Sequence, residues 1–344
     1  MSILKIKGIN FRTIIFPFLV AVSMIIGIML SFKFKKEGNT VGVFGIPLGL
    51  FFMIYPAMTK VGIERIARSF KDMKSVGLMV FLNYAIAPFL VAGIAYLFFR
   101  VIIEPLRIYN ENIISQVIVG IILLGVAPCI AMVMVWTDMA KGNLSMGVSF
   151  VAWNSILQVI TTPFFVYFLA RTTVFINPFL ILESVLLYLI TPLIAGTLTR
   201  RLLRKRRNFS RILNDLGNLQ NIALLFTIVV IFWTEGHGIV EYPSLIWMVG
   251  IVMILFYFIL FHVGYFTSRR LKYKYEDSTA IGFTVAARDF EVSIAIAIVA
   301  FSAYPFVAIT TAIGPLLEIP LMLILVSMQV IRRDRIQMMY SGNV

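Results

Sequence analysis

The stretch GVAPCIAMVMVW, residues 125–136, contains the only cysteine of the chain, Cys129, directly after Pro128. Both residues lie inside a long apolar run. Proline has no N–H group, so the carbonyl one turn earlier, on Leu124, loses its helical partner. In hydrocarbon, a freed carbonyl is tolerated only where protein or a water-filled cavity meets it. The stretch therefore predicts a helix break beside a thiol, at a place suited to binding something small and polar.

The composition surrounding this stretch is that of a membrane protein. Of the 344 residues, 60% are hydrophobic and 13% are charged, which leaves too little polar sequence to wet the surface of a soluble domain. The net charge of +14 does not indicate nucleic acid, because the basic residues lie in short loops between apolar runs. One cysteine excludes an intramolecular disulfide and a thiolate-cluster metal site within one chain.

Ten apolar runs are long enough to cross a bilayer, which takes about 20 residues per helix. The links between them are short and polar, and no soluble domain or long linker separates them. The sequence predicts an all-α polytopic membrane protein in which residues 1–344 form one transport unit. The ten expected spans are 11–32, 41–60, 76–100, 115–139, 145–170, 177–200, 217–234, 245–268, 277–301 and 304–331.

The basic residues are distributed unevenly over the links. If the N-terminus is cytoplasmic, most of the 30 lysines and arginines fall on the cytoplasmic side, as the positive-inside rule requires. We therefore expect an inner-membrane protein with both termini in the cytoplasm. The densest cluster, residues 200–211, is interpreted as an electrostatic anchor to the inner leaflet, with no need for a specific lipid.

The two halves of the chain show a faint internal repeat. Ten spans suggest two five-helix repeats, about 11–170 and 177–331, and an odd number of helices per repeat makes the second inverted. An offset of 160 residues superposes polar interruptions in spans four and nine, and polar residues before prolines in spans five and ten. The superposed pairs are Pro128 with Arg288, Cys129 with Asp289, and Gln158 with Glu318. This pattern predicts two broken helices that cross at a binding site.

Four charged residues are expected near mid-membrane: Arg288, Asp289, Glu291 and Glu318. A charge there costs at least ~2.5–3.5 kcal/mol and usually faces a cavity or another charge. One interpretation is a structural ion pair joining Arg288 to Asp289 or Glu291. Glu318 has no basic residue near it in its own run, so it is the candidate for a group that gains and loses the transported proton.

Cys129 also has two interpretations. A free cysteine often serves only as a small buried hydrophobic residue. As a functional group, its thiolate is a soft ligand that suits a thiophilic solute far better than a sugar or an alkali cation. Pro128 and the matching interruption in span nine favour the functional interpretation. The sequence holds no cluster of metal-ligating residues and predicts no cofactor.

Three motifs resemble those of the ACR3-type arsenite efflux carriers. They are APCIAMVMVW at 127–136 with DMAKG at 138–142, FEVSIAIAI at 290–298, and GPLLEIP at 314–320. That family shares a superfamily with the bile-acid/sodium symporters. The resemblance implies a core domain, in which helices four and nine cross at broken midpoints, and a separate panel domain. It also implies that Cys129 binds trivalent arsenic and that Glu318 handles the coupled proton.

One departure from the family lies before Phe290. The family often has amides at the two preceding positions, where this chain has Arg288 and Asp289. We expect both to contact the solute. We further hypothesise that the Arg288 guanidinium occupies the place that a sodium ion fills in the symporters, which would make transport independent of sodium.

These observations predict a secondary transporter that exports arsenite, or antimonite, in exchange for protons. Its partners are the solute, protons and the lipid bilayer, without nucleic acid, and its oligomeric state is left open. The alternative is a sodium-coupled symporter of an organic anion, whose carboxylate or sulfonate Arg288 would meet. A membrane-embedded enzyme or sensor is disfavoured, because the chain has no nucleophile–base pair, no metal-ligand cluster and no soluble domain.

Overall fold

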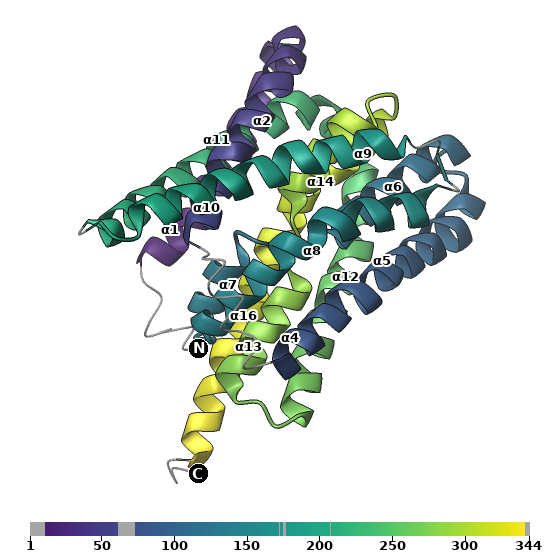
Figure 1. Ribbon diagram of the computed structural model, residues 1–344. Helices are drawn as coiled ribbons and strands as arrows, with labels where there is room; N and C mark the ends of the chain where they lie inside the picture. Colours follow the sequence, from purple (N-terminus) through teal and green to yellow (C-terminus); the bar gives the residue numbers. More distant parts are fainter. Residues whose placement is uncertain (1–10, 61–72, 172, 175–176, 207, 341–344) are drawn as a thin grey trace.

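The computed structural model describes residues 11–60, 73–171, 173–174, 177–206 and 208–340, which form an almost entirely helical molecule (Figure 1). These residues include no strand, and their one extended pairing is an isolated antiparallel bridge between Pro128 and Arg288. The expected all-α class is therefore confirmed. Several basic residues used in the orientation argument lie outside the described residues, namely Lys5, Lys7, Arg65, Arg68, Lys71 and Arg207.

The helices follow one another with short connections. In the first half they are α1 (Phe11–Lys33), α2 (Lys35–Lys60), α4 (Met73–Val80), η2 (Phe81–Ile86), α5 (Ala87–Tyr96), η3 (Leu97–Ile103), η4 (Glu104–Leu106), α6 (Glu111–Val126), α7 (Val133–Met139) and α8 (Leu144–Ala170). In the second half they are α9 (Pro178–Val185), η5 (Leu186–Ile190), α10 (Thr191–Leu203), α11 (Phe209–Glu241), α12 (Pro243–Arg270), α13 (Tyr275–Ala286), α14 (Phe290–Ala300), α15 (Pro305–Ala312) and α16 (Gly314–Tyr340). Three of them, η2, η3 and η5, are π-helical turns, a form that is frequent at functional sites.

Local sequence explains where several helices begin. The side chain of Asn110 accepts the Ile113 N–H at 2.9 Å, and that of Asn143 accepts the Met146 N–H at 3.1 Å. Each thereby satisfies one of the N–H groups that the first turn leaves without an intrahelical partner. Helices α12 and α15 begin with a proline, whose missing N–H costs nothing at that position.

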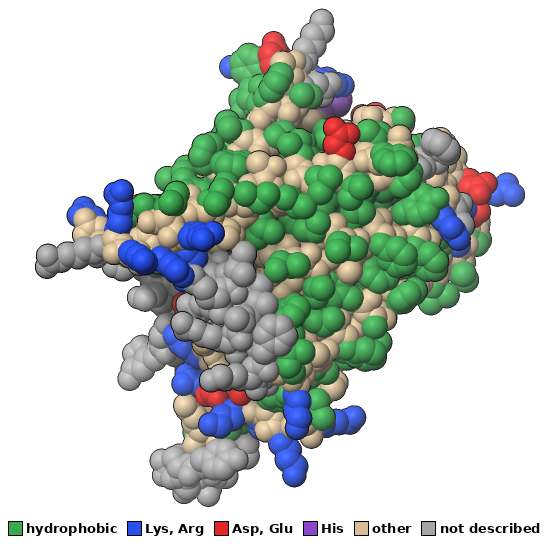
Figure 2. All heavy atoms as spheres, in the orientation of Figure 1, with side chains coloured by type: hydrophobic (Ala, Val, Ile, Leu, Met, Phe, Trp, Pro, Cys, Tyr) green, Lys and Arg blue, Asp and Glu red, His purple; other side chains and the backbone are tan. Residues whose placement is uncertain are grey.

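Seven helical segments of the described residues are long and apolar enough to cross a membrane. They are Thr40–Lys60, Met73–Leu106, Leu144–Ala170, Pro178–Leu203, Arg211–Glu241, Pro243–Arg270 and Pro305–Met338. Large apolar side chains also cover the visible face between its charged ends (Figure 2). Ile160, for example, is 74% exposed, and a large surface made of many such side chains is typical of a membrane-facing protein. The chain is therefore a multi-pass membrane protein.

The other three expected spans are shorter or interrupted. The first contains the apolar helix Phe18–Lys33. Span 115–139 is divided into α6 and α7, and span 277–301 into α13 and α14. The ten crossings and the inverted relation of the two halves stay predictions.

Two groups of helices pack within the molecule (Figure 1). In the first group, α11 packs against α1 and α2, and α10 packs against α2. In the second group, α6 packs against α5, α8 and α15, while α12 packs against α13 and α16. Helix α14 contacts both groups, since it meets α6 and α15 on one side and α9 and α2 on the other. The first interrupted helix thus packs within the second group, whereas the α14 part of the second contacts both groups.

Candidate functional site

The two helix interruptions lie against each other in the interior. The Cys129 N–H donates to the Ala287 carbonyl at 3.1 Å, and the Asp289 N–H donates to the Ala127 carbonyl at 2.8 Å. These two bonds form the antiparallel bridge at Arg288. Each interruption therefore satisfies backbone groups that the other leaves open, which is how irregular backbone is tolerated at membrane depth. We call this pairing of residues 127–129 with 287–289 the crossing.

Side-chain hydrogen bonds also hold the crossing together. The Ser293 hydroxyl lies 2.8 Å from the Leu123 carbonyl near the end of α6, and 2.8 Å from the Asp289 carbonyl. The Asp289 carboxylate accepts the Val292 N–H at 3.1 Å and so caps the start of α14. Helix α14 is consequently anchored to the end of α6 by its own first turn.

Glu318 reaches the crossing from α16. Its Oε1 accepts the backbone N–H of Arg288 at 3.3 Å, and its Oε2 accepts the Tyr257 hydroxyl at 3.1 Å. The carboxyl group is buried. The start of α16 approaches closely, because a Cβ atom on Gly314 would lie 2.6 Å from Leu124 Cδ2. Glu318 therefore ties α12 and α16 to the second interruption.

The guanidinium of Arg288 forms no ion pair with this carboxyl group. Its Nη2 donates to Asn83 Oδ1 at 3.1 Å and also to the Val285 carbonyl, and its Cζ lies 5.4 Å from the centre of the Phe256 ring. Within the described part of the chain, no carboxylate oxygen lies within 4.0 Å of it, and its Nε and Nη1 have no hydrogen-bond partner. The structural ion pair of Arg288 with Asp289 or Glu291 is therefore wrong, because the guanidinium donates to an amide oxygen and a backbone carbonyl instead.

That amide belongs to a polar network that the sequence did not single out. Asn83 Nδ2 lies 3.4 Å from Asn154 Oδ1 and 3.4 Å from the Thr284 carbonyl. The Tyr84 hydroxyl donates to Asn154 Oδ1 at 3.2 Å. Asn83 and Tyr84 lie in η2, and both are buried. The sequence signal that could have indicated this network is the asparagine, Asn83, inside the apolar span 76–100.

Cys129 is a free, buried thiol beside several acids. It lies within electrostatic range of Glu318, Asp289 and Glu291, as well as of Tyr257. The described residues contain no group of three or more His, Cys, Asp or Glu side chains that could hold a metal ion. The site therefore combines one soft ligand atom with hard carboxylate oxygens, a set that suits a thiophilic solute bearing hydroxyl groups.

Unpaired polar atoms mark where such a solute could be held. The Asp289 and Glu291 carboxyl groups lie close enough to share a proton. Asp289 Oδ2 and Glu291 Oε1 are buried without another hydrogen-bond partner, like Arg288 Nε and Nη1. Buried polar atoms left unpaired cost about 1–3 kcal/mol each, so their accumulation at one place indicates a polar ligand or water. Gln158, the counterpart of Glu318 under the repeat offset, is also buried with both amide atoms unpaired, but it forms no hydrogen bond to the crossing.

The structure thus brings together all four predicted site residues, Cys129, Arg288, Asp289 and Glu318, from three separate parts of the chain. It adds Tyr257 and Asn83 as direct hydrogen-bond partners of Glu318 and Arg288. Tyr257 gave no signal in the sequence, because a tyrosine among the many aromatic residues of span 245–268 does not stand out.

Comparison with known proteins identifies the family of this chain. A family model described as Sodium Bile acid symporter family matches residues 47–242, more than half of the chain. An uncharacterized transporter from Synechocystis is 31% identical, covering 89% of this chain and 85% of its own length. The arsenical-resistance protein Acr3 of Corynebacterium glutamicum is 31% identical over 82% of this chain and 76% of its own length. The Acr3 protein of Alkaliphilus metalliredigens is 28% identical over 93% of this chain and 92% of its own length.

The matched region includes the first interruption with Cys129, and the alignments with relatives extend over most of the chain. The family and these relatives are transporters and not enzymes. The chain therefore belongs to the sodium bile acid symporter family, as a transporter of the Acr3 type.

Proposed function

We propose that this transporter exports arsenite from the cytoplasm in exchange for protons, with antimonite as a second candidate solute. One observation carries the proposal: the only thiol of the chain is buried at the crossing, to which Glu318 is hydrogen-bonded. The names of two relatives, arsenical-resistance protein Acr3, support the choice of solute.

The chemistry at Cys129 is a single ligand exchange. At neutral pH, arsenite is mostly the uncharged trihydroxide. One arsenic–sulfur bond forms as one arsenic–oxygen bond breaks, and the thiol proton leaves with the departing hydroxyl as water. A single thiolate holds arsenic weakly enough to release it, whereas three would retain it. Having one cysteine in the whole chain therefore suits transport better than sequestration.

The remaining hydroxyls of the solute need polar partners. Asp289 Oδ2 can accept a hydrogen bond from a bound hydroxyl, and Arg288 Nε and Nη1 can donate to one, since none of these atoms has a partner. We assign solute contact to both residues for this reason. The thiol then provides selectivity for a soft element, and the two charged side chains provide orientation.

Glu318 is assigned the coupled proton. Its two oxygens each accept a hydrogen bond, from the Arg288 N–H and from the Tyr257 hydroxyl. A protonated carboxyl has less acceptor capacity and gains a donor, so protonation weakens at least one of these contacts. Binding and release of the proton would therefore loosen and tighten the attachment of α16 to the crossing, which couples proton movement to movement of the helices.

The architecture that serves this cycle is a further part of the proposal. Residues 1–344 form one transport unit of ten membrane crossings, with inverted repeats at about 11–170 and 177–331. The group containing α6, α8 and α12–α16 would act as the core domain, and the group of α1, α2, α10 and α11 as the panel domain. The paired interruptions support this division, as does the basic bias of the links, which favours cytoplasmic termini in the inner membrane.

The test is uptake of radiolabelled arsenite into everted membrane vesicles. We expect uptake that needs an imposed proton gradient, collapses with a protonophore and is unchanged when sodium is replaced by choline. Sodium dependence would contradict the hypothesis that the Arg288 guanidinium replaces a sodium ion. Absence of arsenite uptake, in vesicles that contain correctly inserted protein, would contradict the proposed solute.

A second candidate function is sodium-coupled uptake of an organic anion. Two observations favour it: the family takes its name from sodium and bile acids, and the buried guanidinium of Arg288 has two unpaired nitrogen atoms that a carboxylate or sulfonate would match. Cells expressing the protein would then accumulate such anions in a sodium-dependent way and would show no gain of arsenite resistance. Measuring uptake of arsenite and of an organic anion in the same vesicles, with and without sodium, decides between the two functions.

A further inference from the structure

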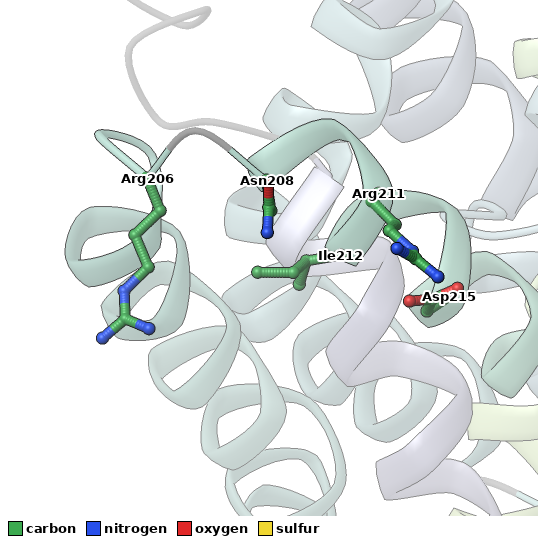
Figure 3. Close-up of a pocket in the computed structure, with 5 residues that line it drawn as sticks. All are labelled: Arg206, Asn208, Arg211, Ile212 and Asp215. Carbon is green, nitrogen blue, oxygen red and sulfur yellow. The ribbon is translucent and has the colours of Figure 1, made fainter.

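A basic hollow lies between the end of α10 and the start of α11, far along the chain from the crossing. It is lined by Arg206, Asn208, Arg211, Ile212 and Asp215 and has a volume of about 510 Å³ (Figure 3). This volume lies within the range of roughly 300–1,000 Å³ that small-ligand sites occupy. We call it the α10–α11 pocket.

The pocket is chemically suited to a phosphate group. Arg206 and Arg211 both line it, Arg206 extending away from Arg211 and the Arg211 guanidinium lying beside Asp215 in Figure 3. A guanidinium group matches phosphate oxygens with paired N–H donors. The Asn208 side chain makes no capping hydrogen bond to α11, so its amide is available to a ligand. Asp215, next to Arg211 in Figure 3, is the one acid of the lining and leaves the pocket net positive.

The surroundings restrict which phosphate compound fits. On α10, Leu198 and Leu202 are 52% and 75% exposed, and on α11 Ile222 is 65% exposed. These apolar side chains begin within a few turns of the pocket, and Figure 2 shows basic side chains gathered at one edge of a broad apolar surface. A ligand there would have its phosphate among the arginines and hydrocarbon chains along the helices.

We propose that the α10–α11 pocket binds the phosphate of an anionic phospholipid of the adjacent leaflet. Basic pockets between membrane helices are recognised lipid head-group sites. The lipid would bridge the end of α10 and the start of α11, two helices that both pack against α2. The cluster 200–211 is then a specific site as well as a general anchor, and this assignment is independent of the solute that the transporter carries.

The test is native mass spectrometry of the purified full-length protein after exchange into mixed phosphatidylglycerol and phosphatidylcholine. We expect wild type to retain phosphatidylglycerol selectively and the double variant Arg206→Gln/Arg211→Gln to retain it at least about tenfold less. The matched control is Arg269→Gln/Arg270→Gln, which removes two exposed arginines from the end of α12, outside the pocket. It should retain phosphatidylglycerol as wild type does.

Two results would overturn the proposal. Equal loss in both double variants would show diffuse attraction to the leaflet in place of a site. Displacement of the lipid by glycerol phosphate or inorganic phosphate at low millimolar concentration would show that the pocket takes soluble phosphate and that the hydrocarbon chains contribute nothing. Circular dichroism of each variant verifies that the helices are intact before lipid retention is compared.

Discussion

The two interruptions at the crossing differ in cause and in chemistry. Between α6 and α7, residues 127–132 are apolar apart from the thiol, and the break follows from Pro128. Between α13 and α14, residues 287–289 contain no proline or glycine, and the new helix starts because Asp289 caps it. One interruption arises from a missing N–H donor, whereas the other is made by a charged side chain.

This difference indicates that the two interruptions have different roles in transport. The first interruption brings a soft atom, Cys129, into the interior, where it can recognise the solute. The second brings Arg288 and Asp289, and it is the one to which Glu318 is attached. We infer that recognition depends mainly on the first and coupling to protons mainly on the second. Substitutions at Glu318, Asn83, Gly314 and Ser293 should separate these two roles, with effects that decrease in that order.

Glu318→Gln should abolish accumulation driven by a proton gradient, because an amide cannot carry the proton. Exchange of labelled for unlabelled arsenite at equal pH, which needs Cys129 but no net proton movement, should persist. The measurement is gradient-driven uptake and exchange in the same vesicles. Glu183→Gln removes an exposed carboxylate on α9 and is the control that should keep both. Normal gradient-driven uptake by Glu318→Gln would remove this residue from the coupling mechanism.

Asn83→Leu should reduce gradient-driven uptake by about tenfold or more. A hydrogen bond to a charged group contributes roughly 1.5–3 kcal/mol, and its loss frees the Arg288 guanidinium to turn toward Glu318. The effect should be much smaller in an Arg288→Gln background, where no guanidinium remains to be held. If uptake is too low to measure, the apparent unfolding midpoints of wild type, the two single variants and the double variant can be compared instead.

The control for this change is Gln329→Leu, which replaces another buried amide whose atoms have no hydrogen-bond partner. It should leave uptake unchanged. If Asn83→Leu lowered uptake or the unfolding midpoint equally in the wild-type and Arg288→Gln backgrounds, Asn83 would act independently of the guanidinium.

Gly314→Ala should lower the apparent unfolding midpoint. The added Cβ would lie 2.6 Å from Leu124 Cδ2 and 3.2 Å from Phe290 Cβ, so either the Leu124 side chain or the start of α16 must shift. Overpacking of this kind costs roughly 1–3 kcal/mol. Gly77→Ala in α4 has no atom within 4 Å of its added Cβ and should be neutral or slightly stabilising. Equal midpoints for the two variants would contradict the close approach of α16.

Ser293→Ala should have the smallest effect, a loss of about 1 kcal/mol in stability. The hydroxyl contacts the carbonyls of Leu123 and Asp289, so its removal loosens α14 from the end of α6. Ser327→Ala is the control, because that exposed hydroxyl only contacts a carbonyl of its own helix. Thermal unfolding in detergent should separate the two; an unchanged midpoint for Ser293→Ala would show that the backbone pairing alone holds the crossing.

Much of the site followed from the sequence, for identifiable reasons. Proline predicts the first interruption directly. The second has no such marker, and only the repeat offset and the cost of buried charge pointed to Arg288 and Asp289. Glu318 was expected nearby on the same grounds. The offset matched Pro128 with Arg288, which are joined by the one isolated bridge among the residues that the structure describes.

The partners of these residues could not be predicted. Asn83 and Arg288 lie 205 residues apart, and Glu318 and Tyr257 lie 61 apart, so only packing brings them together. The π-helical turn that presents Asn83 has no marker in an apolar run. Charge alone suggested that Arg288 pairs with an acid. The structure instead gives it an amide, a carbonyl and an aromatic ring, which are set by the packing of η2, α12 and α13.

The central claim is that Cys129 binds arsenic through its sulfur. X-ray absorption at the arsenic edge, measured on the purified protein with bound arsenite, tests it most directly. We expect one sulfur neighbour around arsenic in wild type and only oxygen neighbours in Cys129→Ser. Met139→Leu, which removes a different sulfur atom close along the chain, should give the wild-type spectrum. A wild-type spectrum with oxygen neighbours alone would contradict the account.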